Sequence, residues 1–142
     1  MTQPLLRTKT IIPPLRPNAV ERTALLTKLD ETTRHALTLI EAPAGFGKTS
    51  LAAAWAVECH YPVAWLTLTE NDKSEERFLS YIVHALQTIF PKIGLTTLAL
   101  IHANPIDNAI YSLINDLSEI EQQYTLILDD FHTVDTPEIA NI

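Results

Sequence analysis

The chain has 142 residues and a hydrophobic content of 46%, which suffices for one globular domain with a substantial core and is too little for two. Its formal net charge of −7 disfavours direct DNA binding, because affinity for duplex DNA comes largely from Lys and Arg side chains that neutralise phosphates. The single cysteine excludes an internal disulfide, and no apolar run reaches the roughly twenty residues of a membrane-spanning helix, so we expect a cytoplasmic chain without membrane contact.

The N-terminal region is rich in proline. Four of the nine prolines lie in the first 17 residues, and proline cannot donate a backbone hydrogen bond, so residues 1–19 are expected to run as an extended arm. Asn18 and Glu21 have the spacing of a capping box, and leucines follow at helical spacing. These features predict a helix over residues 20–33.

The rest of the chain alternates between strand and helix patterns. Short apolar runs predict buried strands at 36–40, 63–68 and 124–128. Amphipathic spacing predicts helices from Gly47 to near Cys59, over 75–90 and over 107–122. Residues 91–105 form a connector with one expected helical turn. Because parallel strands need crossover connections, this order predicts an α/β fold with a parallel sheet and flanking helices.

A phosphate-binding loop, or P-loop, is predicted between the first strand and the helix that follows it. The Walker A segment reads Ala42, Pro43, Ala44, Gly45, Phe46, Gly47, Lys48 and Thr49, and Ser50 follows it. Glycine permits close backbone approach, and the N–H groups at a helix N-terminus attract anions. Lys48 would reach the β- and γ-phosphates of ATP, and the Thr49 hydroxyl would bind Mg²⁺. The alternative is a glycine turn before an ordinary helix.

An acidic pair ends the third predicted strand, and together they form a Walker B segment at 124–130. Alone, Asp129 and Asp130 would be read as a turn or a helix cap. Together with the P-loop, they predict a magnesium-binding strand in which Asp129 holds the ion, mostly through its waters, and Asp130 orients or deprotonates the attacking water.

Other polar and aromatic residues are interpreted as structural. An acidic run is expected to be a solvated helix start: Glu70, Asp72, Glu75 and Glu76. The five histidines lack metal-ligand spacing, and the two tryptophans and Phe78 have the periodicity of core residues.

The combination of segments resembles the N-terminal domain of MalT-like LuxR-type transcription regulators, which are STAND-class signal-transduction ATPases. The segments that carry the resemblance are 6–9, 12–18, 42–49, 62–66 and 126–132. The resemblance implies a P-loop NTPase fold, ATP and Mg²⁺ as ligands, weak ATP hydrolysis that resets a switch, and self-association in the ATP-bound state. It also implies that the arm, with Val20 and Arg22, lies near the adenine and ribose.

In that family the pattern continues with a further strand, a sensor domain and a helix-turn-helix module that binds DNA. None of these is present here, so we expect a partial P-loop domain over 20–142 with about three of the five core strands and with a gap in its sheet. Two alternatives remain. The chain is a self-sufficient small ATPase or kinase, or it is a non-catalytic interaction module that binds a full-length relative.

Overall fold

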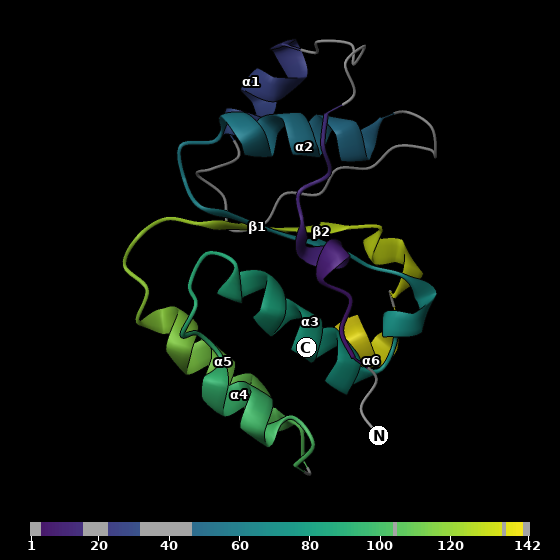
Figure 1. The fold of residues 1–142 in the computed structure, drawn as a ribbon, viewed down its shortest axis with the longest axis vertical. Coiled ribbons are helices and arrows are strands. Elements are labelled where there is room, and N and C mark those ends of the chain that lie inside the picture. Colours follow the sequence, from purple (N-terminus) through teal and green to yellow (C-terminus); the bar gives the residue numbers. More distant parts are fainter. Residues whose placement is uncertain (1–3, 16–22, 32–46, 104, 135, 141–142) are drawn as a thin grey trace. The chain divides into compact units, whose positions relative to one another are not determined.

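The computed structural model describes residues 4–15, 23–31, 47–103, 105–134 and 136–140 (Figure 1). The chain divides into two compact units, one formed by Met1–Ile11 with Tyr61–Ile142 and the other by Ile12–His60. The chain therefore passes from the first unit to the second after Ile11 and returns after His60. In the described residues, no helix combines the length and the apolar character needed to cross a membrane.

The unit formed by Ile12–His60 contains helices α1 (Thr23–Glu31) and α2 (Lys48–Glu58). Both confirm helices predicted from the sequence, although residues 20–22 and 32–33 of the first prediction lie outside the described residues. The predicted strand at 36–40 also lies outside them. Helix α2 buries one stripe of side chains, Ala52, Ala53, Trp55 and Ala56, so the predicted core position of Trp55 is confirmed.

The other unit contains a parallel sheet of two strands, β1 (Val63–Thr67) and β2 (Thr125–Asp129). Trp65 pairs with Ile127, and the register continues to Thr67 opposite Asp129. The three central residues of β1 are buried, as expected for a strand covered on both faces. Two predicted strands and their parallel direction are thus confirmed. The sheet makes the unit a mixed helix and strand structure that is compatible with an α/β class.

The crossover between the strands carries the long amphipathic helices that the sequence predicts. Helix α3 (Glu75–Gln87) packs on β1, and the pair formed by α4 (Leu95–Leu100) and α5 (Asp107–Ser118) lies on the other side of α3 (Figure 1). Short elements follow β2, namely the 3-10 helix η4 (Phe131–Thr133) and helix α6 (Pro137–Ala140). The core includes Leu66, Leu79, Tyr81, Val83 and Leu86, and Phe78 packs edge-on against Phe131 with 6.5 Å between ring centroids.

The connector after α3 has a packing role that the sequence did not reveal. Gly94 adopts φ 70° just before α4, and its N–H donates a 2.8 Å hydrogen bond to the Asp116 carboxylate of α5. A Cβ atom at this position would lie 2.5 Å from a methyl carbon of Val83. Glycine therefore lets the chain turn closely against α3 while it enters α4.

The N-terminal arm departs from the extended course expected for it. Residues Arg7–Thr10 form a 3-10 helix, η1, in which Lys9 is 8% exposed. The Lys9 ammonium donates a hydrogen bond of 2.5 Å to Asp72 and one of 3.0 Å to the Thr69 hydroxyl. A buried ammonium needs such partners. These hydrogen bonds hold the arm against the rest of its unit, and the proline pattern does not predict them.

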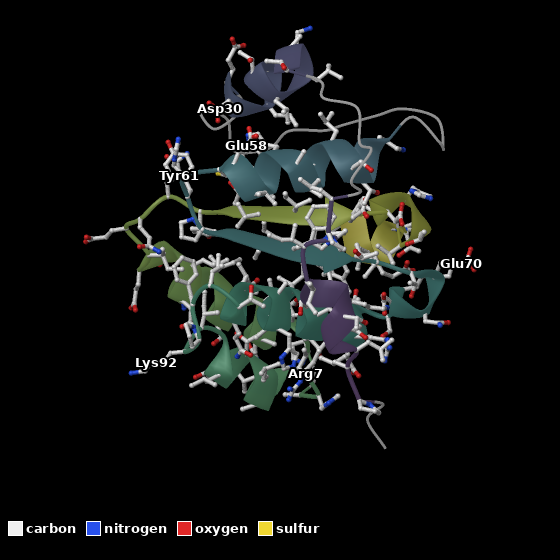
Figure 2. All side chains as sticks on the ribbon, turned by 45° about the horizontal axis from the view of Figure 1, so that its top comes forward. Arg7, Asp30, Glu58, Tyr61, Glu70 and Lys92 are labelled. Carbon is white, nitrogen blue, oxygen red and sulfur yellow. The ribbon has the colours of Figure 1, made fainter. Side chains whose placement is uncertain are left out.

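The prediction of a solvated acidic run is wrong for Asp72. This residue ends the 3-10 helix η3 (Glu70–Asp72) and is fully buried, whereas Glu70 points outward (Figure 2). Besides Lys9, the Asp72 carboxylate accepts hydrogen bonds from Arg77 Nε at 3.0 Å and from the Thr69 backbone N–H at 2.9 Å. One anion between two cations is charge-compensated, which explains how a carboxylate can be buried here.

This environment predicts how stability depends on pH. Burial raises the pKa of Asp72, but the hydrogen bonds from Lys9, the Thr69 backbone and Arg77 outweigh burial and hold the pKa below its ordinary value of 3.8. A lowered native pKa means that the stabilisation is complete above the unfolded value and is lost as the pH falls through the native one. We expect the difference in unfolding free energy between the wild type and Asp72→Asn to shrink below pH 3.8. Urea titrations between roughly pH 6 and pH 2.5 measure this, and a constant difference would contradict it.

Candidate functional site

The phosphate-binding part of the predicted site lies at the start of α2. Gly47 precedes the helix with φ 76° and ψ 29°, a left-handed conformation that favours glycine over other residues. Its carbonyl accepts a 2.9 Å hydrogen bond from the Leu51 N–H, which closes the first helical turn. The helix therefore begins at Lys48, the residue for which the P-loop pattern predicts it.

The electrostatics of this helix start favour an anion. The first turn contains Lys48, Thr49 and Ser50 and no acidic residue, and Gly47 offers no side-chain cap. N–H groups of a first helical turn have no acceptor within the helix, and the helix dipole adds partial positive charge. The half-buried Lys48 adds a full positive charge. These groups are the donors that a phosphate ligand requires.

The magnesium-binding part of the predicted site lies at the carboxyl end of β2. Asp129 is the last residue of the strand and is half-buried. Its carbonyl accepts a 3.0 Å hydrogen bond from the Leu68 N–H, and the strand register places it opposite Thr67. The backbone of Asp129 is thus held by β1. Its carboxylate and the Thr49 hydroxyl are hard oxygen donors of the kind that Mg²⁺ prefers, so their chemistry fits this ion.

Asp130 has the only positive φ among the described residues other than glycine, 59°, with ψ 35°. It precedes η4, and its carbonyl accepts hydrogen bonds from the Thr133 N–H at 3.0 Å and from the Thr133 hydroxyl at 2.8 Å. The side chain is exposed. Aspartate tolerates this conformation better than most residues, and strained backbone of this kind is found at functional sites. An exposed carboxylate directly after Asp129 has the chemistry needed to orient water.

The predicted site residues fall into three groups: those at the start of α2, those at the end of β2, and those that the structure does not describe. Gly47, Lys48, Thr49 and Ser50 share one turn of α2, and Asp129 and Asp130 adjoin at the end of β2 in the other unit. The remaining predicted site residues lie outside the described residues: Val20, Arg22, Ala42, Pro43, Ala44, Gly45 and Phe46. No group of three or more His, Cys, Asp or Glu that could hold a metal occurs among the described residues. A magnesium ion held by one or two protein oxygens, waters and phosphates does not require such a group.

The sequence interpretation missed the buried ion-pair cluster formed by Lys9, Asp72 and Arg77. A signal was present, since Thr69 and Asp72 have capping-box spacing, and the structure forms that box with both reciprocal hydrogen bonds. The pairing with Lys9 spans 63 residues and has no local sequence pattern.

Comparison with known proteins relates the chain to regulators of transcription. No protein-family model matches it. A stretch of 120 residues is 38% identical to the HTH-type transcriptional regulator MalT of Serratia proteamaculans (strain 568) and 36% identical to MalT of Yersinia pestis (strain Pestoides F). The same identity of 36% is found with MalT of Yersinia pseudotuberculosis (serotype O:1b, strain IP 31758).

These matches cover 82% of this chain. The match spans only 13% of the length of these relatives, so the chain is a homologue of a segment of MalT regulators.

Proposed function

We propose that this chain is the ATP-binding switch region of a MalT-like transcription regulator of the STAND class and LuxR family, with a P-loop NTPase fold. The observation that carries the proposal is the left-handed Gly47, from which α2 begins at Lys48. A left-handed glycine that leads directly into a helix is compatible with a phosphate loop, and the sequence motif predicts a helix start at this position. The relationship to transcriptional regulators supports a switch rather than a metabolic role.

In this proposal each group has one task. The first turn of α2 and Lys48 bind the phosphates, and Thr49 and Asp129 hold Mg²⁺, which would neutralise charge that develops on the phosphates during hydrolysis. Asp130 orients or deprotonates the water. Slow hydrolysis would reset the switch in the complete regulator, and DNA binding would belong to parts of the regulator other than this acidic chain. Self-association or association with a full-length relative would transmit the nucleotide state.

Isothermal titration calorimetry of the purified chain with ATP tests the proposal directly. We expect saturable binding of one ATP that becomes tighter when Mg²⁺ is present. Absence of ATP binding, with and without Mg²⁺, would refute the proposed function.

The magnesium role of Asp129 predicts a specific change in this titration. In Asp129→Asn we expect the gain in ATP affinity from Mg²⁺ to fall by roughly tenfold, because a neutral amide is a weaker ligand for a hard cation, while affinity measured in EDTA stays within about twofold. Asp107→Asn is the matched control, since Asp107 is exposed at the start of α5. An undiminished magnesium gain in Asp129→Asn would show that another residue holds the ion.

A further inference from the structure

The outward side of helix α5 carries two exposed apolar side chains. Tyr111 is 61% exposed and Ile114 is 53% exposed. Their spacing of three residues places them next to each other on the helix surface, on the side away from the buried Ala109. Ile110 and Leu117 lie beside them at helical spacing, and both are half-buried against the core. These four apolar side chains, Ile110, Tyr111, Ile114 and Leu117, form a continuous surface that we call the α5 stripe.

Acidic residues lie at both ends of the α5 stripe. Asp107, the first residue of α5, is exposed four residues before Tyr111 and therefore lies on the same side of the helix. Glu119 and Glu121 are exposed at the other end, directly after the helix. None of these three carboxylates forms a salt bridge within the part of the chain that the structure describes. Residues 93–142 contain eight Asp or Glu and no Lys or Arg, so α4, α5 and β2 supply no such cation.

The C-terminal end of α5 also lacks its usual electrostatic partner. The last carbonyl groups of a helix carry partial negative charge, which favours Lys, Arg or His nearby. The last turn of α5 contains no basic residue, whereas α1 has Lys28 and α3 has His84 in this position. Glu119 occupies the C-cap of α5 instead, and Glu121 follows. A cation that binds at this end from outside would therefore be attracted by the helix end and by both carboxylates.

We propose that the α5 stripe docks a basic amphipathic helix of a partner protein. Apolar side chains of that helix cover Tyr111 and Ile114, as in helix recognition by apolar surfaces. Its Lys or Arg residues lie near Asp107 at one end and near Glu119 and Glu121 at the other, because opposite charges at the rim of an interface select the partner. A second copy of this chain fits less well, since its α5 would bring further carboxylates and no cation. The inference goes beyond ATP binding and does not depend on it.

Fluorescence anisotropy of a labelled synthetic helix tests this proposal. The probe is a Leu–Lys peptide of about 18 residues, roughly five helical turns, with its leucines on one face. One comparison peptide replaces every Lys by Glu, and another has the same composition in an order that spreads the leucines around the helix. We expect saturable binding of the amphipathic Leu–Lys helix alone, with an affinity that falls by roughly tenfold when the salt concentration rises from about 50 mM to about 300 mM.

Variants of the α5 stripe separate its apolar and charged parts. Tyr111→Gln with Ile114→Gln should lower the affinity by roughly tenfold, because the apolar contact is lost. Glu119→Gln with Glu121→Gln should lower it by roughly threefold to tenfold and should weaken its dependence on salt. Val57→Gln is the matched control, since Val57 is 63% exposed on α2, and it should leave the affinity unchanged. Circular dichroism checks that these exposed substitutions preserve the fold.

Several results would overturn the inference. Equal affinity of the Leu–Lys helix for the wild type and for Tyr111→Gln with Ile114→Gln would show attraction by net charge alone. Equally tight binding of the Leu–Glu helix would contradict the charge complementarity. Dimerisation of the wild type in sedimentation velocity that is lost in the same double variant would assign the α5 stripe to a second copy. Absence of binding by the Leu–Lys helix would show that no such helix docks here, whether or not the chain binds ATP.

Discussion

Lys48→Ala is expected to weaken ATP binding by roughly tenfold to a hundredfold. A hydrogen bond to a charged group contributes about 1.5–3 kcal/mol, and about 1.4 kcal/mol corresponds to a tenfold change in affinity. In the proposed site Lys48 contacts the β- and γ-phosphates, so the loss should be larger for ATP than for AMP. Calorimetric titrations with ATP, ADP and AMP measure this dependence on phosphate number.

The fold of this variant should be unaffected, because alanine is the better helix former at the first turn of α2. Lys28→Ala is the matched control, since Lys28 is an exposed lysine of α1 in the same unit. Unchanged ATP affinity in Lys48→Ala, with the circular dichroism spectrum preserved, would show that this loop does not bind the phosphates.

Asp72→Ala is expected to lower the unfolding free energy by about 3–5 kcal/mol, the usual cost of removing one partner from a buried ion pair. The substitution leaves Lys9 and Arg77 facing each other without an anion, and the Lys9 side chain is only 9% exposed. It also removes the acceptor for the Thr69 N–H in the capping box. Glu70→Ala is the matched control on the same 3-10 helix, and as an exposed site it should change stability by less than about 0.5 kcal/mol.

Fluorescence of Trp65 can report unfolding of this unit selectively in a Trp55→Phe background. Trp65 is fully buried in β1, and replacing Trp55 removes no hydrogen bond between its indole N–H and the described residues.

A double variant, Lys9→Met with Asp72→Leu, should be less destabilised than the sum of the single variants, because both buried charges are removed together. Additive effects would show that Lys9 and Asp72 are not coupled.

The elements with strong periodicity could be predicted from the sequence. Helices α3 and α5 were predicted from their apolar stripes and found with ends shifted by a few residues, because helix termini depend on capping and on neighbouring packing. Strands β1 and β2 were predicted from apolar runs that are typical of buried strands. The three central residues of β1 are buried as expected, whereas all residues of β2 are only partly buried. The start of α2 at Lys48 was predicted from the Walker A motif and is found at that residue.

The sequence predicted residues for the candidate site, which stay a prediction, but it did not predict the backbone conformation of Asp130. The sequence assigned Asp130 to water activation from its place after Asp129, but its left-handed backbone depends on the turn into η4 and on the two bonds from Thr133. Likewise, Gly94 was one residue of a connector without an evident role until the neighbouring Val83 side chain showed why no Cβ fits there.

Local patterns therefore predicted helices α1, α2, α3 and α5 and strands β1 and β2, because each of these elements depends on residues that are close together in the sequence. The tertiary structure alone decided that Lys9 is buried, that Asp72 is its partner and that the proline-rich arm is anchored rather than extended throughout. These features join residues 63 positions apart in the sequence. Whether a charged side chain is buried depends on which distant segments pack around it, and a local sequence pattern does not encode those contacts.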